Sequence, residues 1–145
     1  MPLTNPTRFS MAIHILAFLG ELRAQRLTSD LIARSVGTSP VVIRRILGQL
    51  KAAGLVTSHK GRKGGFALLA DPHNISLLHI YRAVQSADPL PVFGIHEHPH
   101  LKCPVGGTIQ AVLEDEFQAV QSAMETALRD LTLTTVLNDI ARRQL

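Results

Sequence analysis

Two groups of cationic side chains lie close together in the sequence and have the types and spacing to bind a polyanion. The segment TSPVVIRRILGQLKAAGL carries Arg44 and Arg45, and the segment KGRKGGF carries Arg62 and Lys63. Such groups donate hydrogen bonds to phosphate oxygens, and an arginine can also bind the edge of a guanine in the major groove. The residue types therefore predict a surface that binds DNA.

The elements that must hold these cations follow the order of a winged helix-turn-helix. Thr28 is predicted to cap a helix that runs to Val36, and Gly37 ends that helix and permits a sharp turn. Ser39 is predicted to cap the next helix, with Pro40 at its first position, where a missing N–H costs nothing. This order predicts the rigid helix pair that fits a DNA duplex.

The second helix is predicted to have one buried face and one exposed face. The residues expected to face the core are Ile43, Ile46, Leu47 and Leu50. The residues expected to face outward are Val41, Arg44, Arg45 and Gly48. Two short strands follow, Leu55–His59 and Phe66–Ala70, and the three glycines between them allow the positive φ angles of a projecting tip.

The predicted DNA contacts come from the first helix, the helix-turn-helix and the loop between the strands. They are Arg8, Thr28, Ser39, Pro40, Val41, Arg44, Arg45, His59, Lys60, Arg62 and Lys63. Ser39 and the N–H groups at the start of its helix are expected to bind a phosphate. The loop cations Arg62 and Lys63 are expected to reach the adjacent minor groove or the backbone. A further phosphate clamp is expected from Thr4, Asn5, Thr7 and Arg8.

Charge and composition indicate a polyanionic partner for the front half of the chain only. Residues 1–66 hold ten basic and two acidic side chains, a net charge of +8, whereas residues 67–145 hold five and nine, a net charge of −4. Five Phe, one Tyr and no Trp provide few stacking platforms, which disfavours single-strand or RNA binding. Two alternatives stay open: a solvated basic face, and a winged helix that binds protein without binding DNA.

The C-terminal part is predicted to join two chains. Apolar residues recur at helical spacing from Pro104 to about Leu131, and about 28 residues at 1.5 Å each give roughly 42 Å, longer than a domain of this size is wide. A last helix, Leu133–Arg143, is expected to fold back against it. The first helix, Arg8–Leu22, is apolar on two faces, and a partner chain is expected to cover one of them.

These elements predict a mainly α fold with a small β-hairpin, in three parts. Residues 1–86 form a winged helix-turn-helix domain, residues 87–102 a sensor loop and residues 103–145 the dimerisation helices. The apolar run Phe9–Leu19 is too short to cross a bilayer and lacks a cleavage site, so cytoplasmic residence without a membrane partner is expected. No nucleophile–base motif or phosphate-binding glycine fingerprint is present, so an enzyme is not expected.

The single cysteine, Cys103, has the position of a sensor. It precedes Pro104, the predicted first residue of the long helix, and is therefore expected at the helix N-cap, where the dipole lowers the pKa of a thiol. A thiolate there can form a sulfenic acid, a mixed disulfide with a small thiol or a bridge to the partner chain. Redox or thiol sensing is the prediction, and a small buried apolar residue is the alternative.

Three histidines precede the cysteine in an H-x-H-x-H-x-x-C pattern. The weak candidate ligands for zinc, copper or nickel are His96, His98, His100 and Cys103. The spacing is not that of a zinc finger, so no metal cofactor is expected, and a metal-responsive regulator is the alternative to redox sensing. In a milder interpretation, His96 hydrogen-bonds Cys103 and tunes its reactivity.

Three segments resemble the BadM/Rrf-two family of bacterial transcription regulators, and the resemblance covers nearly the whole chain. They are RFSMAIHILAFL, LKAAGLVTSHKGRKGGF and DPHNISLLHIYRAVQ. The resemblance, to a superfamily with IscR-, NsrR- and CymR-like members, implies a homodimer that binds palindromic operators and crosses its long C-terminal helices to pair. The implied DNA contacts are Ser39, Val41, Arg44, Arg45 and, in the wing, Arg62 and Lys63. The regulator is expected to act as a repressor.

Many relatives in that family hold an iron–sulfur cluster through three cysteines in the loop before the long helix. Cys103 stands alone in this chain, so a three-cysteine cluster is not expected. The segment HEHPHLKCPVG instead resembles a cluster-less branch with a lone cysteine in a Cys-Pro-Val-Gly motif. A small thiol or an oxidant acting at Cys103 is the effector that the sequence suggests.

Overall fold

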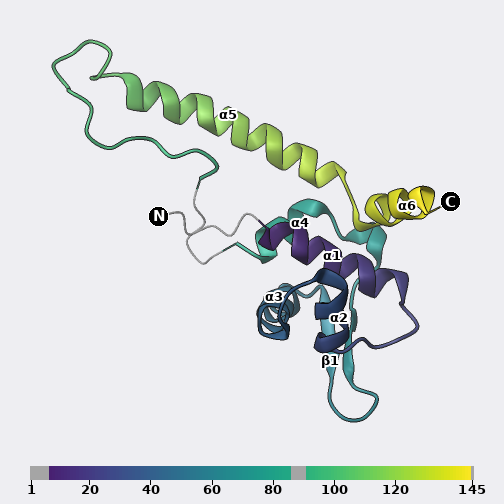
Figure 1. The fold of residues 1–145 in the computed structure, drawn as a ribbon. Helices are drawn as coiled ribbons and strands as arrows, with labels where there is room; N and C mark the ends of the chain where they lie inside the picture. Colours follow the sequence, from purple (N-terminus) through teal and green to yellow (C-terminus); the bar gives the residue numbers. More distant parts are fainter. Residues whose placement is uncertain (1–6, 86–90, 145) are drawn as a thin grey trace.

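The structure is a computed structural model that describes residues 7–85 and 91–144. Figure 1 shows a body of helices with a projecting hairpin at one end and a long helix that leaves the body at the other. The elements are α1 (Arg8–Glu21), α2 (Ser29–Val36), α3 (Pro40–Ala52), β1 (Val56–His59), β2 (Gly65–Leu68), the 3-10 helix η1 (Pro72–Asn74), α4 (Leu77–Ala83), α5 (Ile109–Asp130) and α6 (Leu133–Arg143). The predicted mainly α fold with a small antiparallel hairpin is confirmed. The predicted domain boundary at residues 86 and 87 lies outside the described residues.

Side-chain caps fix the two helices of the helix-turn-helix as predicted. Thr28 Oγ1 accepts a hydrogen bond from the N–H of Leu31 at 3.2 Å, and Ser39 Oγ accepts one from the N–H of Val42 at 3.3 Å. Gly37 follows α2 with a left-handed φ of +85°, which a residue with a Cβ rarely adopts. The turn between α2 and α3 is therefore set by residue type.

The predicted inward face of α3 lies in the hydrophobic core. Ile43, Leu47 and Leu50 are fully buried, and Ile46 is 1% exposed. The core also receives buried side chains from α1, α2 and α4, which pack against α3 or against one another. The orientation of α3 about its own axis is thereby fixed.

The wing is the antiparallel hairpin of β1 and β2, with His59 opposite Gly65 at the end nearest the loop. β1 begins one residue later than predicted. The N–H of Leu55 donates instead to the carbonyl oxygen of Leu50 at 3.0 Å and so completes the end of α3. Leu55 links the two elements, because its carbonyl oxygen also accepts a hydrogen bond from the N–H of Leu69 at 3.0 Å, beside the hairpin.

A short segment before α2 supports the wing. The N–H of Leu27 donates to the carbonyl oxygen of Phe66 at 2.9 Å, and the N–H of Phe66 donates back at 2.8 Å. Gly65, which directly precedes Phe66, has a φ of +140°, and a Cβ added at Gly65 would lie 2.7 Å from the carbonyl oxygen of Leu27. This close approach of two backbones explains why the position holds glycine.

The long helix begins at Ile109, so the predicted start at Pro104 is wrong. Residues 104–108 form turns, and α5 starts at Ile109 with Thr108 as its N-cap residue. Gly106 lies against the backbone of His100, and a Cβ added at Gly106 would lie 2.2 Å from the His100 carbonyl oxygen. This loop crossing replaces the first helical turns. The 22 residues of α5 give a length of about 33 Å instead of 42 Å.

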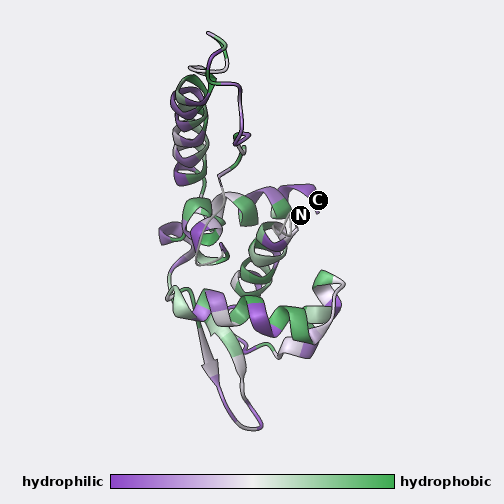
Figure 2. Ribbon diagram, turned by 90° about the vertical axis from the view of Figure 1, so that its left-hand side faces the viewer, coloured by the Kyte–Doolittle hydropathy of each residue, from purple (hydrophilic) through white to green (hydrophobic). Residues whose placement is uncertain are grey.

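α5 extends away from the body and has no buried residue among those described. Its apolar positions are half-buried or exposed: Ile109, Leu113, Phe117, Val120, Met124 and Leu128. Figure 2 shows hydrophobic and hydrophilic residues alternating along the helix. Neither this helix nor any other described one is long and apolar enough to cross a membrane.

The last helix, α6, packs on α1 and η1, so the prediction that it folds back against α5 is wrong. Leu133 at its start is fully buried, and its N–H donates to the carbonyl oxygen of Ile75 at 2.8 Å. The N–H of Leu77 donates in turn to the carbonyl oxygen of Leu131 at 2.8 Å. These bonds hold the junction of α5 and α6 against the start of α4.

Both apolar faces of α1 meet other parts of the same chain. Met11, Phe18 and Leu22 are partly buried against the core, and a partner chain on one of these faces stays a prediction. The two apolar faces of α1 are explained by its central position, because α2, α3, α4, β2 and α6 all contact it.

Replacing Leu133 with Ala should lower the free energy of unfolding by about 2–5 kcal/mol, because the substitution leaves a cavity in the core. Urea denaturation followed by circular dichroism measures the change. Leu69→Ala is the matched control, since Leu69 is 62% exposed, and should cost less than about 1 kcal/mol. Equal losses at the two positions would show that α6 is not anchored through Leu133.

Candidate nucleic-acid interface

α3 presents the predicted outward face to solvent. Val41 is 58% exposed, and Arg44, Arg45 and Gly48 are exposed as well. In Figure 1, α2, α3 and the hairpin lie at one end of the molecule, away from α5 and α6. The cations of α3 and of the wing therefore share one end of the protein.

The start of α3 offers fewer phosphate donors than predicted. Pro40 has no N–H, and the N–H groups of Val42 and Ile43 are already bonded to the side chain and the carbonyl oxygen of Ser39. Val41 carries the remaining N–H of this turn. The Ser39 hydroxyl accepts in its cap and keeps its own proton to donate. A phosphate at this position would therefore meet one N–H and one hydroxyl.

Arg44 and Arg45 have different surroundings. One guanidinium nitrogen of Arg44 lies 3.4 Å from the Oγ of Ser29, in the first turn of α2. Arg45 forms no hydrogen bond or ion pair with any described residue. Sequence reasoning did not identify Ser29, because its position beside Arg44 depends on how α2 crosses α3.

The wing carries its predicted cations at an exposed tip. His59, Lys60, Arg62 and Lys63 are all exposed. The loop departs from expectation in one detail, because among the three loop glycines only Gly61 and Gly65 have positive φ angles. Gly64 is needed for space, since a Cβ there would lie 2.4 Å from the carbonyl oxygen of His59.

Two cations that sequence reasoning missed brace the wing. A guanidinium nitrogen of Arg26 donates to the carbonyl oxygen of Lys63 at 3.4 Å. The Nζ of Lys51, at the end of α3, donates to the Oγ of Ser58 on β1 at 2.7 Å. Neither contact could be predicted from helical or strand periodicity, because the two residues of each contact lie in different parts of the fold.

Arg8 is the first residue of α1 and is partly exposed. Its predicted partners Thr4 and Asn5 lie outside the described residues. The phosphate clamp at the start of α1 therefore stays a prediction.

Cys103 lies in the turns before α5, so its predicted position at the helix N-cap is wrong. The N–H of Gly106 nevertheless lowers the pKa of the Cys103 thiol by hydrogen bonding to the sulfur, and the N–H of Val105 adds to this. Burial opposes the shift. The expected direction is thus produced by a glycine-containing loop and not by the helix dipole. The side chain is partly exposed, which also disfavours the buried apolar alternative.

The histidine run does not come together around the cysteine. The carbonyl oxygen of His96 accepts a hydrogen bond from Gln110 at 3.0 Å, and the His98 ring lies 3.8 Å from the Glu97 carboxylate. No hydrogen bond of the described residues joins His96 to Cys103, contrary to the milder prediction. In residues 7–85 and 91–144, no three His, Cys, Asp or Glu side chains are grouped to hold a metal ion. The expectation that the chain holds no metal cofactor stays a prediction.

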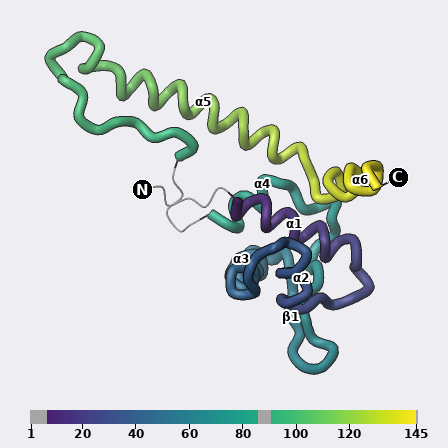
Figure 3. The backbone as a smooth tube through the Cα atoms, in the orientation of Figure 1, coloured from purple at the N-terminus to yellow at the C-terminus, as the bar shows by residue number. Residues whose placement is uncertain are grey.

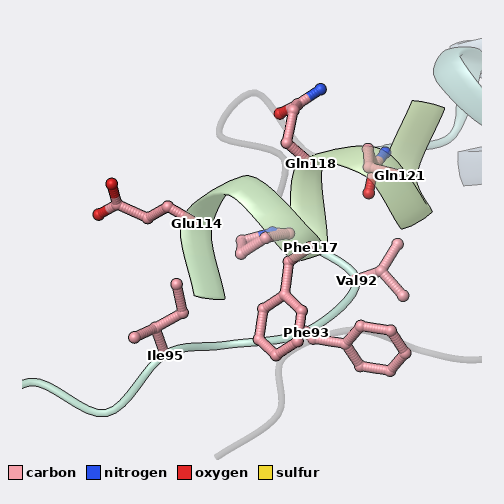
Figure 4. A pocket seen from close by; sticks show the side chains of 8 residues that line it. Val92, Phe93, Ile95, Glu114, Phe117, Gln118 and Gln121 are labelled. Atoms are coloured by element: carbon pink, nitrogen blue, oxygen red, sulfur yellow. The ribbon is translucent and has the colours of Figure 1, made fainter. Parts of the chain in front are cut away.

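Residues 91–95 contact α5, and Figure 3 shows the loop that joins this segment to the helix. The rings of Phe93 and Phe117 meet with centroids 5.4 Å apart. Figure 4 shows Val92 and Ile95 beside this pair, around a cavity of about 340 Å³, while Glu114 points away from the rings. Phe93 is 48% exposed, so the cavity is open on one side.

The chain is similar in sequence to a family of transcription regulators. Residues 5–139 match the Rrf2 family, described as "Iron-dependent Transcriptional regulator". YwnA of Bacillus subtilis (strain 168), a candidate HTH-type transcriptional regulator, is 44% identical over 134 residues, which cover 92% of this chain and 97% of YwnA. The iron dependence in this description is said of the family and not of this chain.

Solved structures agree with this assignment. A crystal structure of a candidate DNA-binding protein has a TM-score of 0.72 and 40% identity, covering 90% of this chain and 98% of the other. CymR, the global cysteine regulator of B. subtilis, has the same fold with a TM-score of 0.69 at 21% identity, over 94% of this chain and 98% of CymR. With its winged helix, exposed recognition face and matched length, this chain belongs to the Rrf2 family of DNA-binding transcription regulators.

Proposed function

We propose that this chain is a transcriptional repressor that binds palindromic operators as a homodimer, without a resident iron–sulfur cluster, and that chemistry at Cys103 changes its affinity for DNA. The observation that carries the proposal is the exposure of the α3 arginines and the wing cations at the same end of the molecule. α3 would enter the major groove while the wing reaches the flanking backbone or minor groove. Occupation of an operator is sufficient to block transcription, which favours repression.

The long helix supports the homodimer. None of its residues is buried within the chain, although its apolar positions follow a helical stripe, and Val120 on that stripe is 47% exposed. Packing against a second α5 would remove this stripe from water. A two-fold dimer presents its two reading helices symmetrically, so its operator is expected to be palindromic.

The loop around Cys103 supports thiol chemistry. A lowered pKa raises the fraction of thiolate near neutral pH, and the thiolate is the attacking species. The Cys103 sulfur would attack one sulfur of a small disulfide, form a mixed disulfide with it and release the other sulfur as a thiolate. The new group would lie between Leu101 and Val105, which are 73% and 67% exposed, close to the start of α5.

A displacement of α5 would be transmitted to the DNA-binding end through the contacts of α4. The residue after α5, Leu131, accepts a backbone hydrogen bond from Leu77 at the start of α4. α4 in turn contacts α1 and α3 in the core. Modification of Cys103 is therefore proposed to act through the angle between the two DNA-binding ends of the dimer.

The wing cations are expected to bind DNA phosphates. The double variant Arg62→Ala/Lys63→Ala should bind duplex DNA more weakly, and its plot of log affinity against log salt should be less steep by about 2, because two phosphate contacts are lost. Fluorescence anisotropy with a labelled duplex measures both quantities. Arg129→Ala, in the last turn of α5, is the charge control and should leave the slope unchanged. An unchanged slope in the wing variant would favour the alternative of a protein-binding winged helix.

The second prediction concerns the dimer. Val120→Glu places a charge on the apolar stripe of α5 and should shift the species at sedimentation equilibrium from two chains to one. Ala119→Glu adds the same charge about 100° around the helix and should leave the dimer intact. If both variants sediment like the parent, α5 does not form the interface.

The third prediction concerns the thiol. The rate at which iodoacetamide alkylates Cys103 should rise with pH around a midpoint below that of the same protein unfolded in urea, because the loop N–H groups stabilise the thiolate only in the folded chain. Mass spectrometry follows the modification. For function, diamide with a small thiol should change the DNA affinity of the parent and not of Cys103→Ser. An equal response in both proteins would exclude Cys103 as the sensor.

A further inference from the structure

The outward face of α3 is not uniform. Successive residues of an α-helix are turned by about 100°, so residues four apart lie almost above one another. Val41 and Arg45 are such a pair, and they lie opposite the buried face formed by Ile43, Ile46, Leu47 and Leu50. Arg44 lies about a quarter turn to one side. Val41 and Arg45 thus form the central strip that would point into a groove.

The hydrogen bonds of Arg44 and Arg45 differ, in agreement with their different positions around the helix. The Arg44 guanidinium lies 3.4 Å from Ser29 Oγ, on the side of α3 that adjoins the first turn of α2. In a helix-turn-helix the first helix crosses the DNA backbone, while residues near the start of the second reach the base edges. Arg44 is thereby held toward the region of the phosphates and away from the centre of the groove.

The Arg45 side chain faces solvent. It has no hydrogen-bond or ion-pair partner among the described residues, and it is exposed. Gly48, three residues further along, has no side chain, and a Cβ added there would meet no atom within 4 Å. The Arg45 guanidinium consequently has room to approach a base edge in a planar, two-bond geometry.

We propose that Arg45 and Val41 determine the operator sequence, reading a guanine and the 5-methyl group of a nearby thymine, whereas Arg44 binds a phosphate and positions α3. Arginine matches the O6 and N7 acceptors of guanine in the major groove, and an exposed apolar side chain matches the thymine methyl group. The proposal rests on DNA binding through α3 and assigns what each of its residues recognises.

The test begins with duplexes selected from a random pool by the wild-type protein. Single guanines in the selected half-site are replaced with 7-deazaguanine, which lacks N7, and single thymines with uracil, which lacks the methyl group. Binding of each duplex, and of a scrambled duplex, is measured for the parent and for Arg45→Ala, Arg44→Ala and Val41→Ala. Circular dichroism checks that each variant is folded.

For Arg45, one 7-deazaguanine position should weaken binding of the parent by about fivefold or more and leave Arg45→Ala unaffected, because the variant no longer uses that acceptor. For Val41, one uracil position should cost the parent about fourfold, the worth of one methyl group, and cost Val41→Ala almost nothing. These matched losses identify the base that each side chain reads.

Arg44→Ala should weaken binding to selected and scrambled duplexes by the same factor and reduce the salt slope by about 1, with the sequence preference kept. The role assignment is overturned if Arg44→Ala changes the selected sequence, or if the parent and Arg45→Ala respond equally to every 7-deazaguanine. If the parent selects no sequence from the pool, the proposed operator binding itself fails, which is a different outcome from an exchange of roles between the arginines.

Discussion

The burial of one face of α3 is the interaction on which the DNA-binding surface depends. Ile43, Leu47 and Leu50 have left water completely, and burial of an aliphatic side chain of this size contributes about 1.5–3 kcal/mol. Rotation of the helix about its axis would return these groups to water. Since a helix is rigid, fixing the inner face also fixes the direction of Val41 and Arg45 on the outer face. Val41 and Arg45 are thus oriented by packing in which they do not themselves take part.

The wing depends on a constraint of a different kind. Its two strands are short, and the bridge between Leu27 and Phe66 adds backbone hydrogen bonds that hold it to the segment before α2. That bridge requires glycine at position 65, where the Leu27 carbonyl oxygen leaves no space for a Cβ. Arg26 and Lys51 then attach the hairpin to its surroundings by hydrogen bonds, and the cations at the tip stay exposed.

The C-terminal half is joined to this body along α6 and where α5 ends. Leu133 is buried, and backbone bonds join residues 131 and 133 to residues 77 and 75, so the junction of α5 and α6 is firmly attached. Beyond it, α5 projects without a buried residue and holds Cys103 in the loop at its far end. In the proposed thiol chemistry, a group added to Cys103 would act at the free end of a helix whose other end is attached to the DNA-binding body.

Local interactions decided most of what the sequence predicted correctly. The caps at Thr28 and Ser39, the left-handed turn at Gly37 and the inner face of α3 each depend on residues within a few positions of one another. A single sequence reports such patterns directly. The exposed α3 and wing cations followed from the same patterns, because a side chain opposite a buried stripe must face solvent.

Contacts between distant segments decided the features that the sequence predicted wrongly or did not reveal. Periodicity extended the long helix to Pro104, but the His100 backbone crosses Gly106 and replaces the first turns with a loop. Cys103 consequently has a lowered pKa through the N–H groups of that loop and not through a helix dipole. The packing of α6 on α1 and the contact of Arg44 with Ser29 also depend on how elements cross in space. The spacing of residues along the chain does not show how these elements cross. Only the tertiary structure therefore shows that Arg44 and Arg45 have different surroundings.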